Sequence, residues 1–370
     1  MINIPSFFGL SVCVFGLGRS GLSSAFALKN SGANVSVWDD SEASRMRAHE
    51  TGLELVDLYN ADWSIFDALV LSPGIALNYP EPHAIVRLAR KCGIEIIGDI
   101  ELFARSKPEA RVIGVTGTNG KSTTTALIGH LLQNAGHNVQ VGGNLGIPAL
   151  DLEQMDELGN YVLEMSSYQL DLTHSLTLDV ALLLNISTDH LDRHGGIEGY
   201  ISSKKRIFMK LGTCDTAIVG IDDAPSRIIY EELKKIGLKK VVGISGEQPV
   251  SGGVYVHSGL LYDFTREGLA KAVMDLGQIP SLPGVHNAQN IAAAYAAARK
   301  CGIESEAIVS GMVSFKGLAH RQELLAVIDG VAYVNDSKAT NGEAAARALS
   351  CYGKVYWIAG GRAKDDGIEA

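Results

Sequence analysis

Short apolar runs alternate with longer amphipathic segments along most of the chain. Buried strands are predicted at residues 12–15, 34–38, 68–71 and 95–97, with helices at residues 22–31 and 84–92. Strands that alternate with helices are typical of a parallel sheet covered by helices. The first part of the chain is therefore predicted to form an α/β unit.

A second alternating series begins at residue 112, after a helix predicted at residues 99–105 that leads to it. Its strands are predicted at residues 112–115, 160–165, 180–186, 217–219 and 239–243, and its helices at residues 123–133 and 286–300. Residues 286–300 are rich in Ala and contain no Gly or Pro, which favours a helix. This series predicts a second α/β unit.

A third, shorter series follows near residue 323. Strands are predicted at residues 324–328, 332–335 and 355–359, around a helix at residues 342–349. A chain of 370 residues is long enough for two or three domains. We expect three α/β domains, at residues 1–97, 98–312 and 313–370.

Composition narrows the class of protein. The chain is 46% hydrophobic and 20% charged, has a net charge of −9 and a pI of about 5.6. These values are ordinary for a globular protein and argue against a basic nucleic-acid-binding face.

The five cysteines of the chain have no metal-ligand or redox-motif spacing. The first residues lack a signal peptide's basic region, and no apolar run approaches the ~18 residues of a membrane helix. We expect a cytoplasmic protein with no nucleic-acid or membrane partner.

A glycine-rich turn precedes the predicted helix at residues 123–133. It consists of Gly117, Thr118, Asn119, Gly120, Lys121, Ser122 and Thr123. The backbone N–H groups of such a turn surround phosphate oxygens, its lysine reaches the terminal phosphates and a hydroxyl holds Mg²⁺. The usual spacing has its first glycine where Val115 stands. The alternative is a turn that only joins the strand to the helix.

A second glycine motif follows the first predicted strand. It consists of Gly16, Leu17, Gly18, Arg19, Ser20 and Gly21. Asp39 ends the next strand, where a dinucleotide-binding unit places a ribose-binding acid. Ser72, Pro73 and Gly74 follow a later strand of the same unit and are predicted to line the same crevice. These features indicate a nucleotide-type ligand, and the alternative is a tight turn without a ligand.

Polar side chains follow other predicted strands. Glu164 ends an apolar strand after the phosphate loop and can complete a Mg²⁺ shell, although many strands end in a charged residue. His190 lies between Asp189 and Asp192 and is a candidate metal ligand or proton carrier, although a single His is usually structural.

The last part of the chain carries further candidates. Arg321 suits recognition of phosphate or carboxylate, and Asp336 at a strand end suits a nucleotide hydroxyl or a metal-bound water. Lys338 and Lys364 can neutralise anionic intermediates. The alternative for each is a solvated loop charge.

In this order along the chain, the motifs resemble those of the Mur ligase family, ATP-dependent amide ligases of peptidoglycan precursor synthesis. The resemblance also includes residues 142–144, 185–193, 286–290 and 335–340, and it spans nearly the whole sequence. Residues 72–76 and 98–103 are most similar to the members that add D-glutamate to UDP-N-acetylmuramoyl-L-alanine. The fold implied is a Rossmann-like N-terminal domain, a central P-loop ATPase domain and a partial Rossmann-like C-terminal domain.

The resemblance implies a role for each motif. The substrate's UDP moiety would contact residues 16–21, Asp39 and residues 72–74, and Asn144 would contact the rest of the substrate. ATP would contact residues 117–123, Asn290, Arg321 and Asp336. Ser122, Glu164, His190 and Lys204 would hold two Mg²⁺ ions, and Lys121, Glu164, His190 and Lys204 would be catalytic. Lys338, Thr340 and Lys364 would contact the amino acid or the intermediate.

Lys204 has a special role in this resemblance. Members of the family carry a carbamylated lysine near the second metal, and Tyr200, Lys204, Arg206 and Ile207 match that pattern, with Lys205 as the neighbouring alternative. The third domain of the family is longer than residues 313–370. We therefore expect the 370-residue chain to be a monomer that binds the UDP-substrate, binds ATP weakly, and forms little or no amide product.

Three other functions remain open from the sequence. One is a Mur-type ligase that adds a different amino acid. Another is an NAD-dependent oxidoreductase built on residues 16–21, which leaves the phosphate loop unexplained. The third is a nucleotide-gated sensor, which gives Glu164, His190 and Lys204 no role.

Overall fold

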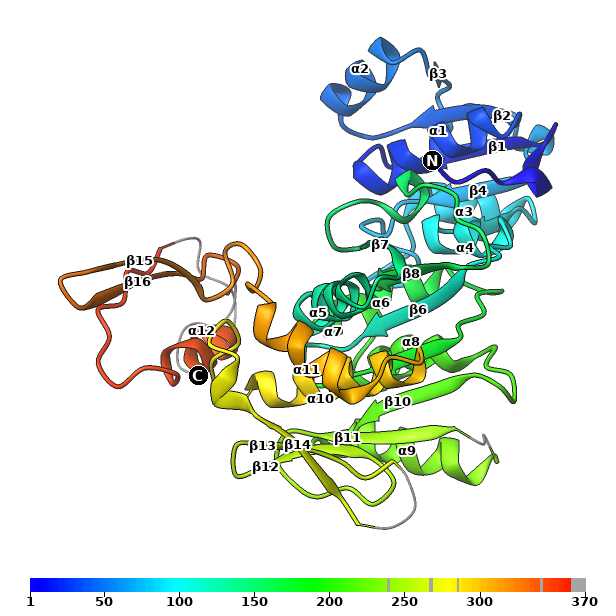
Figure 1. Cartoon of the computed structure of the whole chain (residues 1–370). Helices are drawn as coiled ribbons and strands as arrows, with labels where there is room; N and C mark the ends of the chain where they lie inside the picture. Colours follow the sequence, from blue (N-terminus) through cyan, green and yellow to red (C-terminus); the bar gives the residue numbers. More distant parts are fainter. Residues whose placement is uncertain (238–239, 266–268, 285, 340–341, 361–370) are drawn as a thin grey trace.

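The first sheet is parallel throughout and has five strands. The computed structural model of the chain describes residues 1–237, 240–265, 269–284, 286–339 and 342–360 (Figure 1). In the first sheet the order is β3-β2-β1-β4-β5, with bounds β1 Ser11–Phe15, β2 Asn34–Trp38, β3 Glu54–Leu55, β4 Ala68–Leu71 and β5 Glu95–Ile97. The order reverses between β1 and β4, and ligands of such sheets bind at the carboxyl ends of the strands beside this reversal.

Three helices belong to the first sheet and a fourth leads to the second. Their bounds are α1 Arg19–Asn30, α2 Glu42–Glu50, α3 Ala84–Lys91 and α4 Asp99–Arg105. The α1 helix begins three residues earlier than predicted, directly inside the glycine motif. This places the positive end of the α1 dipole against that motif.

The central sheet has nine strands, in the order β14-β13-β12-β11-β10-β9-β6-β8-β7. The strands from β7 to β12 are parallel, and β12, β13 and β14 form an antiparallel meander. Their bounds are β6 Arg111–Thr116, β7 Asn138–Gly143, β8 Gly159–Glu164, β9 Val180–Leu183, β10 Thr216–Gly220, β11 Val241–Ser245, β12 Val254–His257, β13 Leu260–Asp263 and β14 Lys271–Asp275. The carboxyl ends of β6, β8 and β9 lie side by side and position the phosphate loop and the acidic residues that follow.

Helices cover both faces of this sheet. Their bounds are α5 Lys121–Asn134, α6 Ser167–Asp171, α7 Leu191–His194, α8 Ile197–Lys205, α9 Ala224–Lys235, α10 His286–Lys300 and α11 Ser305–Ser314. One hydrophobic core joins α5, α10 and α11 to the sheet, and another continues from the other face into the first sheet. In this second core the rings of Phe103 and Tyr161 meet edge to face, 5.1 Å between centroids.

The last described elements are β15 Glu323–Ile328, β16 Val331–Asn335 and α12 Gly342–Leu349. The two strands pair antiparallel in a sheet of their own, which projects away from the central sheet at the left of Figure 1. The predicted strand at residues 355–359 is wrong, because these residues have no strand conformation. Among the described residues no neighbouring strand pairs with them, and Tyr356 and Ile358 are almost fully exposed.

Most other predicted elements are confirmed with small shifts at their ends. The predicted strand 180–186 ends at Leu183, and the chain then bonds the phosphate loop: Asn185 O accepts from Thr118 N at 2.9 Å. Among the helices in the described part of the chain, none combines the length and apolar character that a bilayer crossing requires.

Candidate functional site

The phosphate loop connects β6 to α5 and depends on glycine. Gly120 has a φ of +84°, and a Cβ there would lie 2.0 Å from Asn290 Oδ1. Only glycine adopts this backbone conformation without strain while its neighbour stays so close. Asn185, after β9, fixes the loop from the other side, since its Oδ1 accepts from Asn119 N at 2.8 Å and its backbone O from Thr118 N at 2.9 Å.

Two lysines meet at this loop, of which Lys121 is partly buried and Lys204 is buried. Lys121 Nζ donates to Gly117 O and Thr118 O, both at 2.8 Å, and Lys204 Nζ donates to the same Gly117 O at 2.8 Å. Burial lowers the pKa of Lys121. Burial, followed by the charge of Lys121, lowers the pKa of Lys204 well below its usual value. The site thus concentrates positive charge beside the loop and favours a neutral amine at Lys204.

Glu164, at the end of β8, lies at the same edge of the sheet. Its Oε1 accepts from Asn144 Nδ2 at 2.6 Å. Its Oε2 is buried and has no hydrogen-bond partner among the described residues. An orphaned buried carboxylate oxygen is costly unless a ligand satisfies it, so Glu164 fits a cation that enters the site.

His190 begins the short helix α7 with a φ of +52°. Its Nε2 lies 3.5 Å from Asp189 Oδ2, and its ring lies 5.2 Å from that of Tyr168. Burial is the main cause that lowers the pKa of His190, which favours the neutral imidazole that metals bind.

Arg321, which precedes β15, reaches the phosphate loop. Its Nη2 donates to Ser122 Oγ at 3.0 Å. Asp336 Oδ1, just after β16, accepts from Gln322 N at 3.1 Å. The last described elements therefore close one side of the site.

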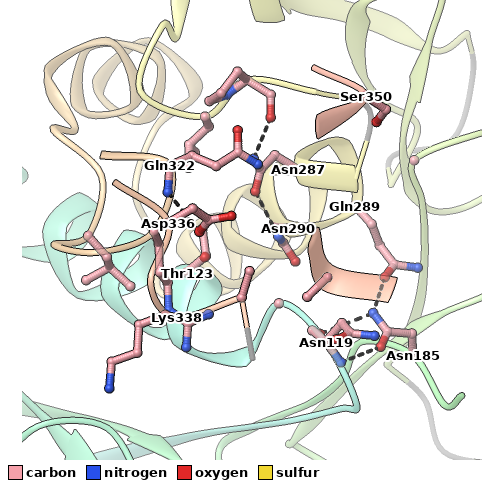
Figure 2. A pocket seen from close by; sticks show the side chains of 18 of the residues that line it. Asn119, Thr123, Asn185, Asn287, Gln289, Asn290, Gln322, Asp336, Lys338 and Ser350 are labelled. Carbon is pink, nitrogen blue, oxygen red and sulfur yellow. Dashed lines mark hydrogen bonds between the residues drawn. The ribbon is translucent and has the colours of Figure 1, made fainter. Parts of the chain in front are cut away.

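A cavity of about 440 Å³ lies between the phosphate loop, α10 and these last elements (Figure 2). Its lining includes Asn119, Gly120, Thr123, Asn290, Arg321, Asp336 and Lys338. These seven sequence-predicted residues thus share one cavity, whereas its lining does not include Lys121, Ser122, Asn144, Glu164, His190 or Lys204. Thr340 and Lys364 lie outside the described residues.

The residues predicted to hold the UDP moiety form a separate group at the carboxyl edge of the first sheet. Ser72 Oγ donates to Gly16 O at 2.7 Å, which ties the loop after β4 to the loop after β1. Asp39 Oδ2 accepts from Leu17 N at 2.5 Å, and its Oδ1 accepts from Ser41 N at 2.7 Å. Asp39 therefore shapes the glycine loop in this state.

Comparison with known proteins places the chain in a family. Residues 10–98 match the model of the Mur ligase MurD-like N-terminal domain, and residues 115–298 match that of the Mur ligase middle domain. The UDP-N-acetylmuramoylalanine--D-glutamate ligase of Caulobacter vibrioides (strain NA1000 / CB15N) is 52% identical over 375 residues, which cover 100% of this chain and 79% of that protein. The chain belongs to the Mur ligase family.

Other comparisons agree. The ligase of the same name from Rhodospirillum rubrum is 49% identical to this Mur ligase, over 100% of this chain and 78% of that protein. The crystal structure of UDP-N-acetylmuramate-alanine ligase MurC from Thermotoga maritima superposes with a TM-score of 0.57 at 16% identity, over 92% of this chain and 77% of that one. The structural match supports the fold alone.

Several polar residues of this Mur ligase were not among the predicted site residues. Asn185 Nδ2 donates to Gln289 Oε1 at 2.9 Å, and Gln289 Nε2 donates to Asp222 Oδ2 at 2.9 Å (Figure 2 labels Asn185 and Gln289). All three line the cavity. Asp222 follows the end of β10, so the strand-end rule that selected Glu164 could have found it. Gln289 lies within the regular pattern of α10, so only its place in the family motif at residues 286–290 could have found it.

Proposed function

We propose that this Mur ligase joins D-glutamate to UDP-N-acetylmuramoyl-L-alanine at the expense of ATP, in the synthesis of peptidoglycan precursors. The observation that carries the proposal is the meeting of Lys121, Lys204 and Glu164 at one phosphate loop. The first unit adds a second glycine loop. The names of the relatives that align over the whole chain support D-glutamate as the added amino acid.

Each of the two glycine loops would bind a different substrate. The UDP moiety would bind residues 16–21, Asp39 and residues 72–74, beside the reversal of strand order in the first sheet. ATP would bind residues 117–123 and the cavity that contains Asn290, Arg321 and Asp336. Asn144 would contact the muramoyl part, because it lies next to Glu164 on the side of the loop after β7.

Ser122, Glu164, His190 and a carbamylated Lys204 would hold two Mg²⁺ ions. Among the described residues there is no group of three or more His, Cys, Asp or Glu side chains that could hold a metal. A carbamate on Lys204 would add carboxylate-like oxygens to the orphaned Glu164 Oε2. It forms when the neutral amine attacks CO₂ and loses a proton, and the lowered pKa of Lys204 favours that form. When bound, Mg²⁺ neutralises negative charge on the phosphates.

The chemistry would run in two steps. The carboxylate of the alanyl group attacks the γ-phosphorus of ATP, and ADP leaves, which produces an acyl phosphate. The amine of D-glutamate then attacks the acyl carbon, the tetrahedral intermediate loses inorganic phosphate, and the amine proton passes to the phosphate or to water. Lys121 holds the phosphates in line and offsets their charge, so catalysis rests on positioning and electrostatics.

The proposal also covers the domain organisation, the oligomeric state, the cellular location and the contacts of three further residues. We propose domains at residues 1–97, 98–312 and 313–370, which act as a monomer in the cytoplasm, where ATP and UDP-sugars are made. Lys338, Thr340 and Lys364 would contact the amino acid or the intermediate.

A ligation assay tests the function. UDP-N-acetylmuramoyl-L-alanine, ATP, Mg²⁺ and one amino acid at a time are incubated with the chain, beside the Caulobacter vibrioides relative as a reference, and the product is identified by mass spectrometry. We expect an adduct with D-glutamate only, with one phosphate released per adduct. The same time course tests the expectation of slow turnover.

Two results would contradict the proposal. Incorporation of another amino acid in place of D-glutamate would favour a different Mur-type ligase. Stabilisation of the protein by NAD in a thermal-shift assay, with hydride transfer and no effect of the UDP-substrate, would favour the oxidoreductase.

A further inference from the structure

Asp99 is a buried carboxylate that the proposed steps do not use. It begins α4, directly after the last strand of the first sheet, and is 3% exposed. Its Oδ1 accepts from Ile100 N at 3.0 Å and its Oδ2 accepts from Gln169 Nε2 at 2.9 Å. These partners are neutral, and burial raises the pKa of Asp99. A buried acid without a cation is costly, so its position needs a reason other than stability.

On one side Asp99 faces the first glycine loop. The side chain of Ser20 lies near the Asp99 carboxylate and acts to lower its pKa, against the larger effect of burial. Ser20 lies in the first turn of α1, and α1 packs against α4. Asp99 therefore lies against the helix that begins in the loop that would hold the UDP moiety.

On the other side Asp99 faces the strand end that carries Glu164. Gln169 Oε1 accepts from Ser166 N at 3.0 Å and from Ser166 Oγ at 3.1 Å, and Ser166 Oγ accepts from Gln169 N, which makes a capping box at the start of α6. Ser166 lies two residues after Glu164. The Gln169 amide thus has a fixed orientation, with its oxygen on Ser166 and its nitrogen on Asp99.

The next residue extends these contacts to the helix of Lys204. Ser167 Oγ lies 3.0 Å from His194 Nε2, and Ser167 O accepts from Ser203 Oγ at 2.7 Å. Ser203 directly precedes Lys204 in α8. Polar contacts and chain neighbours therefore lead from Asp99, through Gln169, Ser166 and Ser167, to the two residues proposed to hold metal.

We propose that Asp99 is a positioning residue that couples the two nucleotide sites through Gln169. Occupation of the first glycine loop would fix Asp99, the Gln169 amide, and the turn that places Glu164. Binding of the UDP-substrate and of ATP would then strengthen each other. This inference rests on the proposed function, because it takes those two ligands as given.

Glu101 provides a matched control on the same helix. It is also buried and also joins α4 to the central unit, but it accepts from His174 N at 2.7 Å and Ser175 N at 2.8 Å, in the segment beyond α6. Loss of this contact should weaken docking of α4 without disturbing the turn at Ser166.

The decisive variant is Asp99→Asn. The new amide has one oxygen and one NH₂ group. If its oxygen accepts from Gln169 Nε2, its NH₂ faces the donor Ile100 N. If its oxygen accepts from Ile100 N, its NH₂ faces the donor Gln169 Nε2. The Gln169 side-chain amide cannot rotate without losing its hydrogen bonds from Ser166. Adding Gln169→Glu restores a complementary pair, because the new carboxylate accepts from both the Asn amide and Ser166.

The experiment measures coupling by calorimetry. The affinity for a non-hydrolysable ATP analogue with Mg²⁺ is determined with and without saturating UDP-N-acetylmuramoyl-L-alanine, and the ratio is the coupling factor. We expect a factor of about fivefold or more in the unsubstituted chain and in Glu101→Gln, less than about twofold in Asp99→Asn, and recovery in the double variant. Ser20→Ala removes the hydroxyl that lies near Asp99 on the side of the first glycine loop. This variant should also lower the coupling factor, and it replaces Asp99→Asn as the test if Asp99→Asn does not fold.

The outcomes separate the two claims. An unchanged factor in Asp99→Asn or, if that variant does not fold, in Ser20→Ala would overturn the inference and leave the proposed function standing, as would a factor near one in the unsubstituted chain. Failure of the unsubstituted chain to bind UDP-N-acetylmuramoyl-L-alanine at all would overturn the proposed function, and the inference with it.

Discussion

The guanidinium of Arg321 lies 3.0 Å from the hydroxyl of Ser122, although 199 positions separate the two residues in the sequence. The contact joins the segment before β15 to the first turn of α5. It brings an arginine to the edge of the phosphate loop and gives the cavity a cationic side. A site assembled in this way depends on single residues, whose substitution gives the following predictions.

Lys121→Ala removes the lysine of the phosphate loop. Loss of one charge-assisted hydrogen bond should lower the affinity for a non-hydrolysable ATP analogue by about 10- to 100-fold. Affinity for the UDP-substrate should stay nearly unchanged, because that ligand binds the first sheet. Calorimetry measures both, with the exposed Lys210→Ala as the control. Loss of both ligands from a folded variant would argue against separate sites.

Lys204→Ala removes the residue proposed to carry the carbamate. We expect turnover to fall by at least about 100-fold, in line with the loss of a residue that acts directly in catalysis. Acetate or formate should restore part of it by occupying the vacated space. Lys205→Ala is the matched control, because Lys205 is an exposed neighbour that pairs with Glu232. Full activity of Lys204→Ala would move the assignment to Lys205 or remove it.

Gly120→Ala tests the shape of the phosphate loop. The alanine must adopt a φ of +84° and meets Asn290 Oδ1 at 2.0 Å. Gly136 also has a φ of +84° but has no atom within 4 Å of an added Cβ, so Gly136→Ala is the control. Both variants should lose about 1–2 kcal/mol of unfolding free energy from the backbone, and only Gly120→Ala should also lose binding of the ATP analogue. Equal binding by the two variants would contradict this account of the loop.

Lys204 should also make stability depend on pH. The unfolded lysine keeps its proton up to about pH 10.5, whereas the folded one releases it at a much lower pH. Between these two values the unfolded chain holds more protons, so the free energy of unfolding should rise with pH. Urea unfolding in CO₂-free buffer at several pH values should show a smaller rise in Lys204→Met. An identical slope in the two proteins would mean that Lys204 is not desolvated.

The sequence predicted those features that local pattern determines. Strands 34–38, 68–71 and 95–97 and the helix at residues 286–300 have the predicted bounds, because each combines a regular apolar pattern with clear ends. The phosphate loop and Glu164 were found because parallel sheets place ligands at the carboxyl ends of strands.

Features that depend on distant partners were not predictable in this way. Residues 355–359 have strand-like composition but no neighbouring strand in the described chain, and the antiparallel meander β12 to β14 follows from pairing that a local window does not reveal. Similarly, the low pKa of Lys204 arises from burial beside Lys121, 83 positions away by their numbering. The role proposed for Asp99 depends on Gln169, which follows it by 70 positions.

The central claim is that ATP activates the carboxylate of the UDP-substrate. UDP-N-acetylmuramoyl-L-alanine labelled with ¹⁸O in its carboxylate tests this claim most directly. In a reaction with ATP and D-glutamate, one labelled oxygen should pass to each inorganic phosphate released, because the acyl phosphate retains that oxygen when its C–O bond breaks. Formation of the D-glutamate adduct with unlabelled phosphate would contradict the acyl-phosphate mechanism.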